Sequence, residues 1–456
     1  MRPGDVHLVE IDGLTPTGAG LGRVGAVVVE VAGAFPGELA QIRVEHVSRQ
    51  QPHAIGRLRS VERAQPQRRA VSCPSHRDAD GGSCCGCPLL GLEAEAQREI
   101  KRAVLAREQG IAVDRVEGDA IELGYRWSSK RVVARRRGRL VLGSYAARSH
   151  HVAAMDGCVI EHPRIVRALA ELASVANRRH VSVYDERTGL GELRYVWCKT
   201  DGQRVLLTLI AGDARCPSVE SLGRELREPA GVWLSVQDNA GNAMRGTRGR
   251  RISGVDSLPV NLAGVVREIG PLGFLQPNPR VIASAYQSLV NGPKPWVPRA
   301  SRALDLYAGL GVTTELLRRR YADVAACEAF PERDGSAKGI ETMTAEAFLP
   351  RQLDAGPVDL VVANPPRAGL GERVCQQLQD LAPQRIHIMS CHPTSLARDL
   401  GRLERAGYRR VGARAYDALP QTAHLEVVVW LEREDATGSS NPSLGPAGGG
   451  PKPALG

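Results

Sequence analysis

A cysteine that could act as a nucleophile follows a short apolar run. Residues 385–390, RIHIMS, predict a strand, and Cys391 comes directly after it. Pro393 and Thr394 then begin a predicted helix, since proline is favoured at the first helical position. The amino end of a helix favours negative charge, so we expect it to lower the pKa of the Cys391 thiol.

A glycine-rich turn earlier in the chain predicts a nucleotide-like ligand. The stretch 303–317, ALDLYAGLGVTTELL, reads as a strand, a turn with Gly309 and Gly311, and a helix. Asp305 lies near the end of that strand, where its carboxylate could accept a hydrogen bond. Glu328 ends the next predicted strand, at a spacing suited to ribose hydroxyls. The pattern fits a dinucleotide fold, an S-adenosylmethionine site or a tight turn, and the missing third glycine favours S-adenosylmethionine.

A second loop ends the next apolar strand, PVDLVVANPPRAGL, with the residues Asn364-Pro365-Pro366-Arg367. Two prolines cannot continue a strand, so the chain leaves the sheet there. Asn364 is then presented at the same sheet edge as the glycine turn, which is where open α/β sheets bind ligands. A Pro-Pro loop without a function is the alternative.

A thiolate beside a methyl donor predicts methylation at carbon 5 of a pyrimidine. Addition of the thiolate to carbon 6 turns carbon 5 into an enolate-like centre that can take a methyl group. A base must then remove the carbon-5 proton before elimination frees the enzyme. Glu426 interrupts a final apolar strand in LPQTAHLEVVVWLER, with His424 two residues earlier on the same face. Glu426 is the candidate base, and an edge-strand glutamate is the alternative.

Composition and charge indicate a cytoplasmic protein and point only weakly to a polyanionic partner. No run reaches the roughly 18 apolar residues of a membrane-spanning helix, and the first residues lack the apolar stretch of a secretory signal. The net charge is +10, and two basic clusters lie in residues 130–139 and 245–251. Such clusters either follow a phosphate backbone or form a solvated face. Four of the ten cysteines lie between Cys73 and Cys87, which predicts metal rather than disulfides.

The pattern along the chain predicts a multidomain α/β protein. Short strands at 6–11, 26–31, 39–44 and 53–61, with turns at Gly18, Gly20, Gly22 and Pro36-Gly37, predict a small β-barrel. A helix over 92–107 and strands at 206–210 and 232–236 follow, and 300–432 alternates strands with helices, as in a parallel sheet. We therefore expect a barrel over 1–64, a central α+β domain over 65–297, a Rossmann-like domain over 298–433 and a disordered tail over 434–456.

Five motifs in order resemble the S-adenosylmethionine-dependent RNA uracil-5-methyltransferases, over about residues 6 to 432. They are Phe274-Leu275-Gln276-Pro277-Asn278, Asp305-Leu306-Tyr307-Ala308-Gly309-Leu310-Gly311, Asn364-Pro365-Pro366-Arg367, Ser390-Cys391-His392-Pro393 and His424-Leu425-Glu426. The resemblance implies that Cys391 is the nucleophile and Glu426 the base. It also implies a methyl-donor site, with these residues: Gln276, Asp305, Tyr307, Gly309, Gly311, Glu328 and Asn364.

The N-terminal half resembles the ribosomal-RNA branch of this family. The glycine series ending in Phe35-Pro36-Gly37-Glu38 is similar to the RNA-binding TRAM domain. The cysteines resemble an iron–sulfur site, with these implied ligands: Cys73, Cys84, Cys87 and Cys158. By chemistry alone four thiolates could equally hold zinc, whereas the resemblance implies a 4Fe-4S cluster. We therefore expect a monomer that methylates ribosomal RNA rather than tRNA.

Three features depart from the family pattern. Asn364 stands where the family usually has an aspartate that is expected to hold the target base, and asparagine cannot carry charge. The stretch from Glu328 to Glu346 is shorter than usual, which predicts a trimmed helix and an altered adenine pocket. The spacing from Cys73 to Cys84 is longer than usual, and Cys85 is an additional thiol.

Two alternatives to a uracil-5-methyltransferase follow from the same motifs. Asn-Pro-Pro followed by an aromatic residue marks methyltransferases of exocyclic amino groups, but Arg367 holds the aromatic position here. The other alternative is an RNA-binding protein that has lost catalysis, for which Asn364 and the short stretch after Glu328 are the reasons. The presence of Cys391 and Glu426 argues against it.

Overall fold

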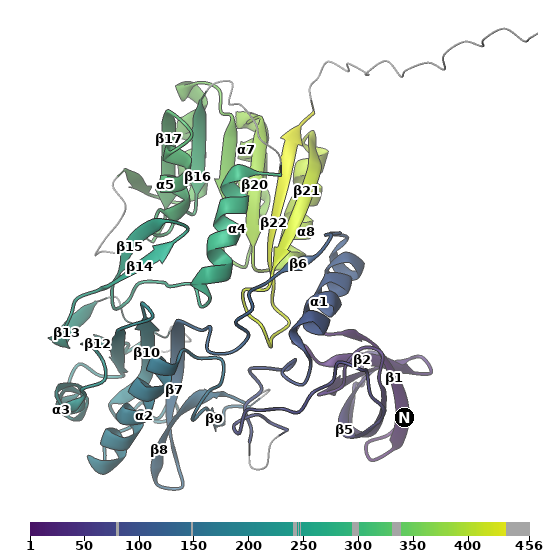
Figure 1. Ribbon diagram of the computed structural model, residues 1–456, viewed down its shortest axis with the longest axis vertical. Helices are drawn as coiled ribbons and strands as arrows, with labels where there is room; N and C mark the ends of the chain where they lie inside the picture. The colour runs from purple at the N-terminus through teal and green to yellow at the C-terminus, as the bar shows by residue number, and fades with distance from the viewer. Residues whose placement is uncertain are drawn as a thin grey trace, which may run out of the picture.

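The computed structural model describes residues 1–78, 82–146, 149–239, 244, 246, 248–293, 301–330 and 339–434. These residues form a closed barrel, a seven-stranded sheet, a two-stranded sheet and an eight-stranded sheet, which Figure 1 shows in their mutual arrangement. The prediction of a mixed α/β fold is confirmed. The predicted disordered tail lies outside the described residues, except for Glu434.

The N-terminal residues form the predicted barrel, closed in the order β1-β2-β3-β5-β4. Its strands are β1 (Val6–Leu14), β2 (Gly20–Val24), β3 (Val27–Ala32), β4 (Leu39–Val47) and β5 (His53–Arg63). The prediction of turns at Gly20 and Gly22 was wrong, because both lie inside β2. A Cβ atom on Gly20 would lie 2.5 Å from the Ala34 carbonyl oxygen, and one on Gly22 2.3 Å from that of Glu10. Glycine therefore allows this strand to pack closely inside a narrow barrel.

The central sheet has the order β13-β12-β11-β10-β7-β8-β9. Its strands are β7 (Ser128–Arg136), β8 (Arg139–Tyr145), β9 (Val152–Ala154), β10 (Leu193–Thr200), β11 (Val205–Ala211), β12 (Gly231–Val236) and β13 (Gly249–Gly254). The predicted strands at 206–210 and 232–236 are confirmed as β11 and β12. Helices α2 (Pro163–Arg178) and α3 (Pro217–Glu225) share an apolar core with this sheet.

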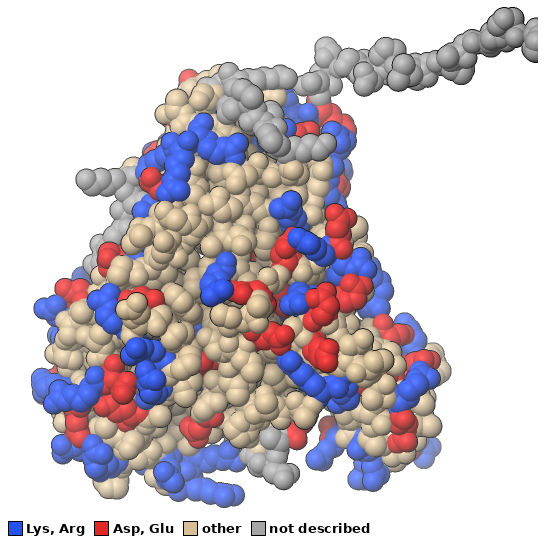
Figure 2. Space-filling view, viewed as in Figure 1, with Lys and Arg blue, Asp and Glu red and all other residues tan. Residues whose placement is uncertain are grey.

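Most of the first basic cluster lies where strands β7 and β8 meet at their connecting turn. Its exposed members are Lys130, Arg135, Arg136, Arg137 and Arg139. Figure 2 shows basic side chains at the lower end of the molecule, where Figure 1 places this turn. Arg131 differs from the rest of the cluster, because its guanidinium is buried in an ion pair with Glu161. It is therefore not available to a phosphate backbone.

The C-terminal sheet is largely parallel and has the order β18-β17-β16-β19-β20-β22-β21-β6. Its strands are β6 (Val116–Glu117), β16 (Arg302–Leu306), β17 (Asp323–Glu328), β18 (Ile340–Thr342), β19 (Leu360–Ala363), β20 (Arg385–Ser390), β21 (Tyr408–Tyr416) and β22 (Glu426–Arg433). The associated helices are α4 (Pro279–Asn291), α5 (Val312–Arg318), α6 (Ala345–Phe348), η1 (Leu349–Ala355), α7 (Gly371–Leu381) and α8 (Pro393–Arg405). The predicted alternation of strands and helices is confirmed, except that β22 runs antiparallel to both neighbours.

Residues from the first third of the chain complete this sheet. Strand β6 pairs in parallel with β21, so that Val116 lies opposite Ala415. Helix α1 (Ala94–Gln109) precedes it and confirms the predicted helix over 92–107. Leu105 and Ile111 belong to the same apolar core as the C-terminal strands. In Figure 1, α1 stands between the barrel and this sheet.

Two short strands, β14 (Leu258–Leu262) and β15 (Val265–Ile269), form a separate antiparallel pair. Arg267 of β15 donates hydrogen bonds to the carbonyl oxygens of Leu310 and Gly311, at 2.9 and 3.0 Å. The pair therefore supports the glycine turn from outside the C-terminal sheet. Among the described residues, no helix is both long enough and apolar enough to cross a membrane.

Candidate active site

The predicted site residues follow strands that end at one edge of the C-terminal sheet. Strands β16, β19 and β20 are parallel, so Tyr307, Asn364 and Cys391 follow their carboxyl ends at that edge. Strand β22 runs the opposite way and begins there with Glu426. Its pairing sets Ser390 opposite Val427, which brings the next residues on each strand, Cys391 and Glu426, together.

Cys391 and Glu426 line one small cavity of about 30 Å³. Its other lining residues are Arg367, Ala418, Leu419, His424 and Leu425. Three chain segments that are far apart in the sequence thus contribute a thiol, a carboxyl, a guanidinium and an imidazole to one space. This combination can carry out nucleophilic addition followed by proton removal.

The expected lowering of the Cys391 pKa does not prevail, because the net shift is upward. Burial raises the pKa of this thiol, and the Glu426 carboxylate raises it further, while the Arg367 guanidinium lowers it. His392 is the N-cap of helix α8, and its side chain accepts the Ser395 backbone N–H. Arg367, which lines the same cavity, is a positive charge that lowers the thiol's pKa, and this role was not predicted from the sequence.

The pKa of Glu426 is shifted toward neutral pH. Burial raises its pKa to about 8, against the opposing effect of Arg367. A base with a pKa close to the working pH is suited to general base catalysis. In the sequence, Glu426 stood out as a charged residue in an apolar strand. In the structure, the burial of its carboxyl group is the main cause of its raised pKa.

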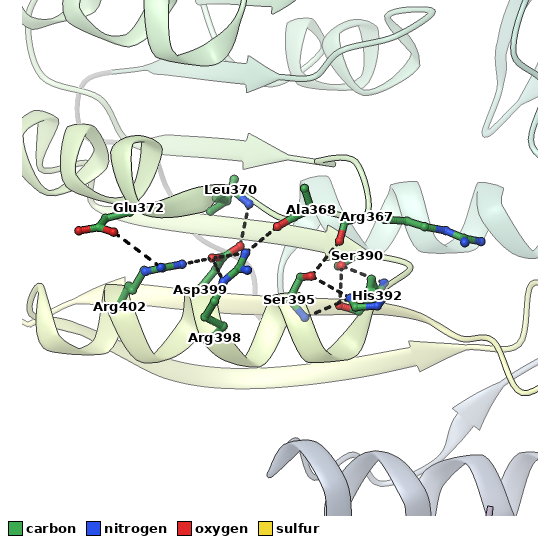
Figure 3. A network of polar contacts seen from close by, with 10 residues as sticks. All are labelled: Arg367, Ala368, Leu370, Glu372, Ser390, His392, Ser395, Arg398, Asp399 and Arg402. Atoms are coloured by element: carbon green, nitrogen blue, oxygen red, sulfur yellow. Dashed lines mark hydrogen bonds and ion pairs between the residues drawn. The ribbon is translucent and has the colours of Figure 1, made fainter. Parts of the chain in front are cut away.

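The loop that carries Arg367 is fixed onto helix α8. The Ser395 hydroxyl donates to the Arg367 carbonyl oxygen at 2.8 Å, and the Leu370 N–H donates to Asp399 Oδ2 at 2.7 Å. Arg398 donates to the Ala368 carbonyl oxygen at 2.6 Å. Figure 3 shows the Arg367 guanidinium extended away from this network. The network therefore holds the backbone of the loop and leaves the charged end for the cavity.

The glycine turn has the open backbone that a ligand needs. Tyr307, Gly309 and Gly311 all have positive φ, at 60°, 55° and 70°. A Cβ atom on Gly309 would meet no atom within 4 Å, so the space beside it is open. Its N–H donates to Glu328 Oε2 at 2.9 Å, which joins the turn to the end of β17.

Asp305 lies beneath this turn and is buried. Its Oδ2 accepts the hydroxyls of Thr313 and Thr314, at 2.7 and 2.6 Å, and burial raises its pKa to about 6. Asp305 therefore ties the strand before the turn to the helix after it. Direct contact between its carboxylate and a ligand stays a prediction.

Tyr286 of helix α4 is a residue that sequence reasoning missed. The Gln276 side chain hydrogen-bonds to its phenol, and burial raises the Tyr286 pKa to about 12. The carboxylates of Glu426 and Asp305 also raise it, so the ring lies near both. In the sequence Tyr286 looks like any residue of an apolar helix face.

Part of the stretch with the predicted trimmed helix, residues 331–338, lies outside the described residues.

The four cysteines implied as ligands are buried and free of disulfides: Cys73, Cys84, Cys87 and Cys158. Three of them, Cys73, Cys87 and Cys158, belong to one small apolar cluster, and burial and charge on the other thiols raise the pKa of Cys87. Cys85 is only partly buried. Within the described ranges, however, no group of three or more His, Cys, Asp or Glu side chains is placed to hold a metal ion. The metal site stays a prediction.

Comparison with known proteins shows that this chain resembles RNA methyltransferases. Residues 351–434 match the family model described as tRNA (uracil-5-)-methyltransferase. An uncharacterized RNA methyltransferase of Gloeobacter violaceus is 29% identical over 94% of this chain and 97% of its own length. An uncharacterized RNA methyltransferase of Bacillus cereus is 27% identical over 93% of this chain and 96% of its own length.

A solved structure has a similar fold over nearly the whole chain. It is the Pyrococcus abyssi tRNA (uracil-54, C5)-methyltransferase in complex with S-adenosyl-L-homocysteine. Its TM-score is 0.73 at 21% identity, and the match covers 93% of this chain and 99% of that one. The comparisons confirm the resemblance to the RNA uracil-5-methyltransferase family: the family model matches the C-terminal residues, these relatives are named RNA methyltransferases, and the solved structure has a similar fold.

Proposed function

We propose that the protein transfers a methyl group from S-adenosylmethionine to carbon 5 of a uridine in RNA. The observation that carries this proposal is the meeting of Cys391 and Glu426 at one cavity, on neighbouring antiparallel strands. Carbon-5 methylation needs both a nucleophile and a base, whereas methylation of an amino group needs no thiol.

The roles of the side chains follow from the chemistry of the pyrimidine ring. The Cys391 sulfur, as thiolate, forms a bond to carbon 6, and carbon 5 then takes the methyl group from the sulfonium donor. Glu426 accepts the proton that carbon 5 loses, and the carbon–sulfur bond breaks to release the methylated uridine. Arg367 opposes the effect of burial on both groups, so it favours the ionised thiol and the ionised carboxyl.

The edge of the C-terminal sheet fits the methyl donor. The proposed contacts are made by these residues: Gln276, Asp305, Tyr307, Gly309, Gly311, Glu328 and Asn364. Support comes from the open backbone at Gly309, the carboxyl of Glu328 beside it and the position of the turn where the strand order reverses at β16. The Pyrococcus abyssi enzyme was solved with the demethylated donor. S-adenosylmethionine supplies the methyl group, and this Rossmann-like domain orients it.

We infer that the RNA is ribosomal rather than transfer RNA. The TRAM-like barrel and the cysteine-rich segment support this choice, although the solved relative acts on tRNA. The exposed arginines of the β7–β8 turn, Arg135 to Arg139, supply a charge that suits a phosphate backbone.

The position of the product's methyl group tests this function. Purified protein is incubated with S-adenosylmethionine and separate unmodified ribosomal and transfer RNAs, and digested nucleosides are resolved by mass spectrometry. We expect 5-methyluridine, formed in ribosomal RNA. A methyl group on an exocyclic nitrogen would contradict the proposed chemistry, and tight salt-sensitive binding without any methylated product would identify a binding protein.

The iron–sulfur prediction is tested by matched cysteine variants. Anaerobically purified protein is expected to contain about four irons and four sulfides per chain. Cys84→Ser should lose them, because the thiolate is a required ligand, whereas Cys85→Ser, at the neighbouring residue, should keep them. If the unaltered protein contains zinc and no sulfide, the prediction of a cluster is wrong and the site holds a single zinc ion.

A further inference from the structure

One wall of the active-site cavity is formed by a segment that lacks regular structure. We call residues 417–425, between β21 and β22, the base segment, because they lead directly into Glu426. Ala418, Leu419 and His424 of this segment line the cavity. In Figure 1 the chain before β22 reaches away from its sheet toward the barrel and the central sheet. Its conformation therefore depends on contacts outside the sheet.

A buried ion pair holds the start of the base segment. Lys101 of helix α1 donates from Nζ to Asp417 Oδ1 at 2.7 Å, and each of the two side chains is 1% exposed. Lys101 Nζ also reaches the Leu419 carbonyl oxygen at 3.5 Å. Buried charges of this kind fix geometry strongly, since neither group can leave its partner without stranding a charge.

A reciprocal amide contact holds the middle of the base segment. Gln97, one helical turn before Lys101, donates from Nε2 to Gln421 Oε1 at 2.7 Å. Its Oε1 accepts the Gln421 backbone N–H at 2.8 Å. Gln421 has a φ of 71°, which side-chain-bearing residues rarely adopt, so Gln97 holds a backbone conformation that costs free energy.

Both glutamines are fully buried. The Leu89 N–H donates to the Gln421 carbonyl oxygen at 3.0 Å, and the Tyr125 hydroxyl donates to that of Pro420 at 2.9 Å. The base segment is therefore held on several sides, and α1 provides the side-chain contacts to both Asp417 and Gln421.

We propose that Gln97 and Lys101 are positioning residues for Glu426, acting through the base segment. This inference rests on the proposed function, because it concerns the base that removes the carbon-5 proton. Displacement of Glu426 removes the base from the step after methyl transfer, and loss of the nearby carboxylate, which raises the thiol's pKa, does not hinder addition. Addition of Cys391 to carbon 6 does not use the base, so it continues when the base is displaced.

The test separates these steps in the full-length protein. The variants are Gln97→Met, the neutral double variant Lys101→Met with Asp417→Asn, and Glu426→Gln as reference. Arg102→Met is the matched control, since Arg102 lies on the exposed side of α1, where it bonds Glu99. With unmodified RNA and S-adenosylmethionine, we measure the rate of denaturant-stable RNA–protein adduct formation, the kcat and the KM for RNA. Thermal melts report folding.

We expect kcat to fall roughly 10-fold to 100-fold in the α1 variants, as for a displaced catalytic group. Adduct should form at a nearly unchanged rate and accumulate, and the KM for RNA should stay close to that of the unaltered protein. Arg102→Met should behave normally. A parallel loss of adduct formation and turnover overturns the inference, because it indicates a general loss of structure. Normal turnover in both α1 variants overturns it as well.

The double variant keeps the test informative if Gln97→Met does not fold, because it removes both charges together. Failure of the proposed function looks different from failure of this inference. If neither the unaltered protein nor Glu426→Gln forms an adduct, the covalent mechanism itself is wrong and the inference falls with it. If Glu426→Gln accumulates adduct and the α1 variants do not, only the inference is wrong.

Discussion

Cys391→Ala is expected to abolish methyl transfer to RNA. Without the sulfur, carbon 5 of the pyrimidine stays a poor nucleophile, and no other described thiol lines the cavity. The loss should reach the detection limit, because the step that activates the ring is removed rather than slowed. It is measured as transfer of a labelled methyl group from S-adenosylmethionine to RNA. Binding of RNA should persist, since the basic β7–β8 turn is unaffected.

Cys375→Ala is the matched control for this variant. Cys375 is a buried thiol of helix α7, in the apolar core of the same sheet and outside the cavity. Its loss should cost about 1 kcal/mol of stability or somewhat more and leave the rate of methyl transfer largely intact. Undiminished activity of Cys391→Ala would refute the covalent mechanism.

Glu426→Gln is expected to lower turnover about 10³-fold while adduct accumulates. Glutamine matches glutamate in shape but cannot accept the carbon-5 proton, so the adduct is methylated and then retained. The measurement is a denaturing gel with labelled RNA, in parallel with kcat. Glu432→Gln is the control, because Glu432 lies on the same strand but outside the cavity. If Glu426→Gln releases the methylated RNA from the adduct at the normal rate, another group accepts the carbon-5 proton.

The pH dependence follows from the same carboxyl. The base acts when it is ionised, and its pKa is about 8. Activity should therefore rise from pH 6 through pH 8, and it should keep rising above pH 8 because burial raises the Cys391 pKa above its ordinary value of 9.0. The residual turnover of Glu426→Gln should lack the part of this rise with pH that the ionisation of Glu426 causes.

Stability should respond to pH in the opposite direction. The pKa of Glu426 is higher in the folded chain, at about 8, than its ordinary value of 4.5. Its favourable contribution to folding is therefore present below pH 4.5 and is lost as the pH rises toward 8. In thermal melts, the Tm of Glu426→Gln should increase relative to that of the unaltered protein as the pH rises over that range. A constant difference in Tm would contradict the raised pKa.

The positions of Cys391 and Glu426 could be predicted because local patterns mark them. An apolar strand, a cysteine and a proline define the end of β20, and a charge in an apolar run marks the start of β22. Parallel strand order then brings such ends to one edge. The effect of burial on the Cys391 pKa could not be predicted, because it depends on how closely other segments cover the thiol.

Gln97 and Lys101 show why the remaining contacts were missed. Each bonds a residue more than 300 positions later, and on α1 alone they look like ordinary polar helix residues. Strand β2 was missed for another reason: its glycines suggested turns, but tight packing in the barrel requires them. Strand β6 has only two residues, which is too short for any periodic pattern.

The pairing of β6 with β21 has a consequence for how the protein is made. The edge strand and helix α1 leave the ribosome about 300 residues before the strand that they adjoin, and contacts of such long range form slowly. Three residues of this region are buried in the core of the complete protein: Leu105, Ile111 and Val116. They stay without their core partners until the C-terminal strands have been synthesised. A fragment started after residue 117 would lack that edge from the outset, so we expect the catalytic half to aggregate when expressed by itself.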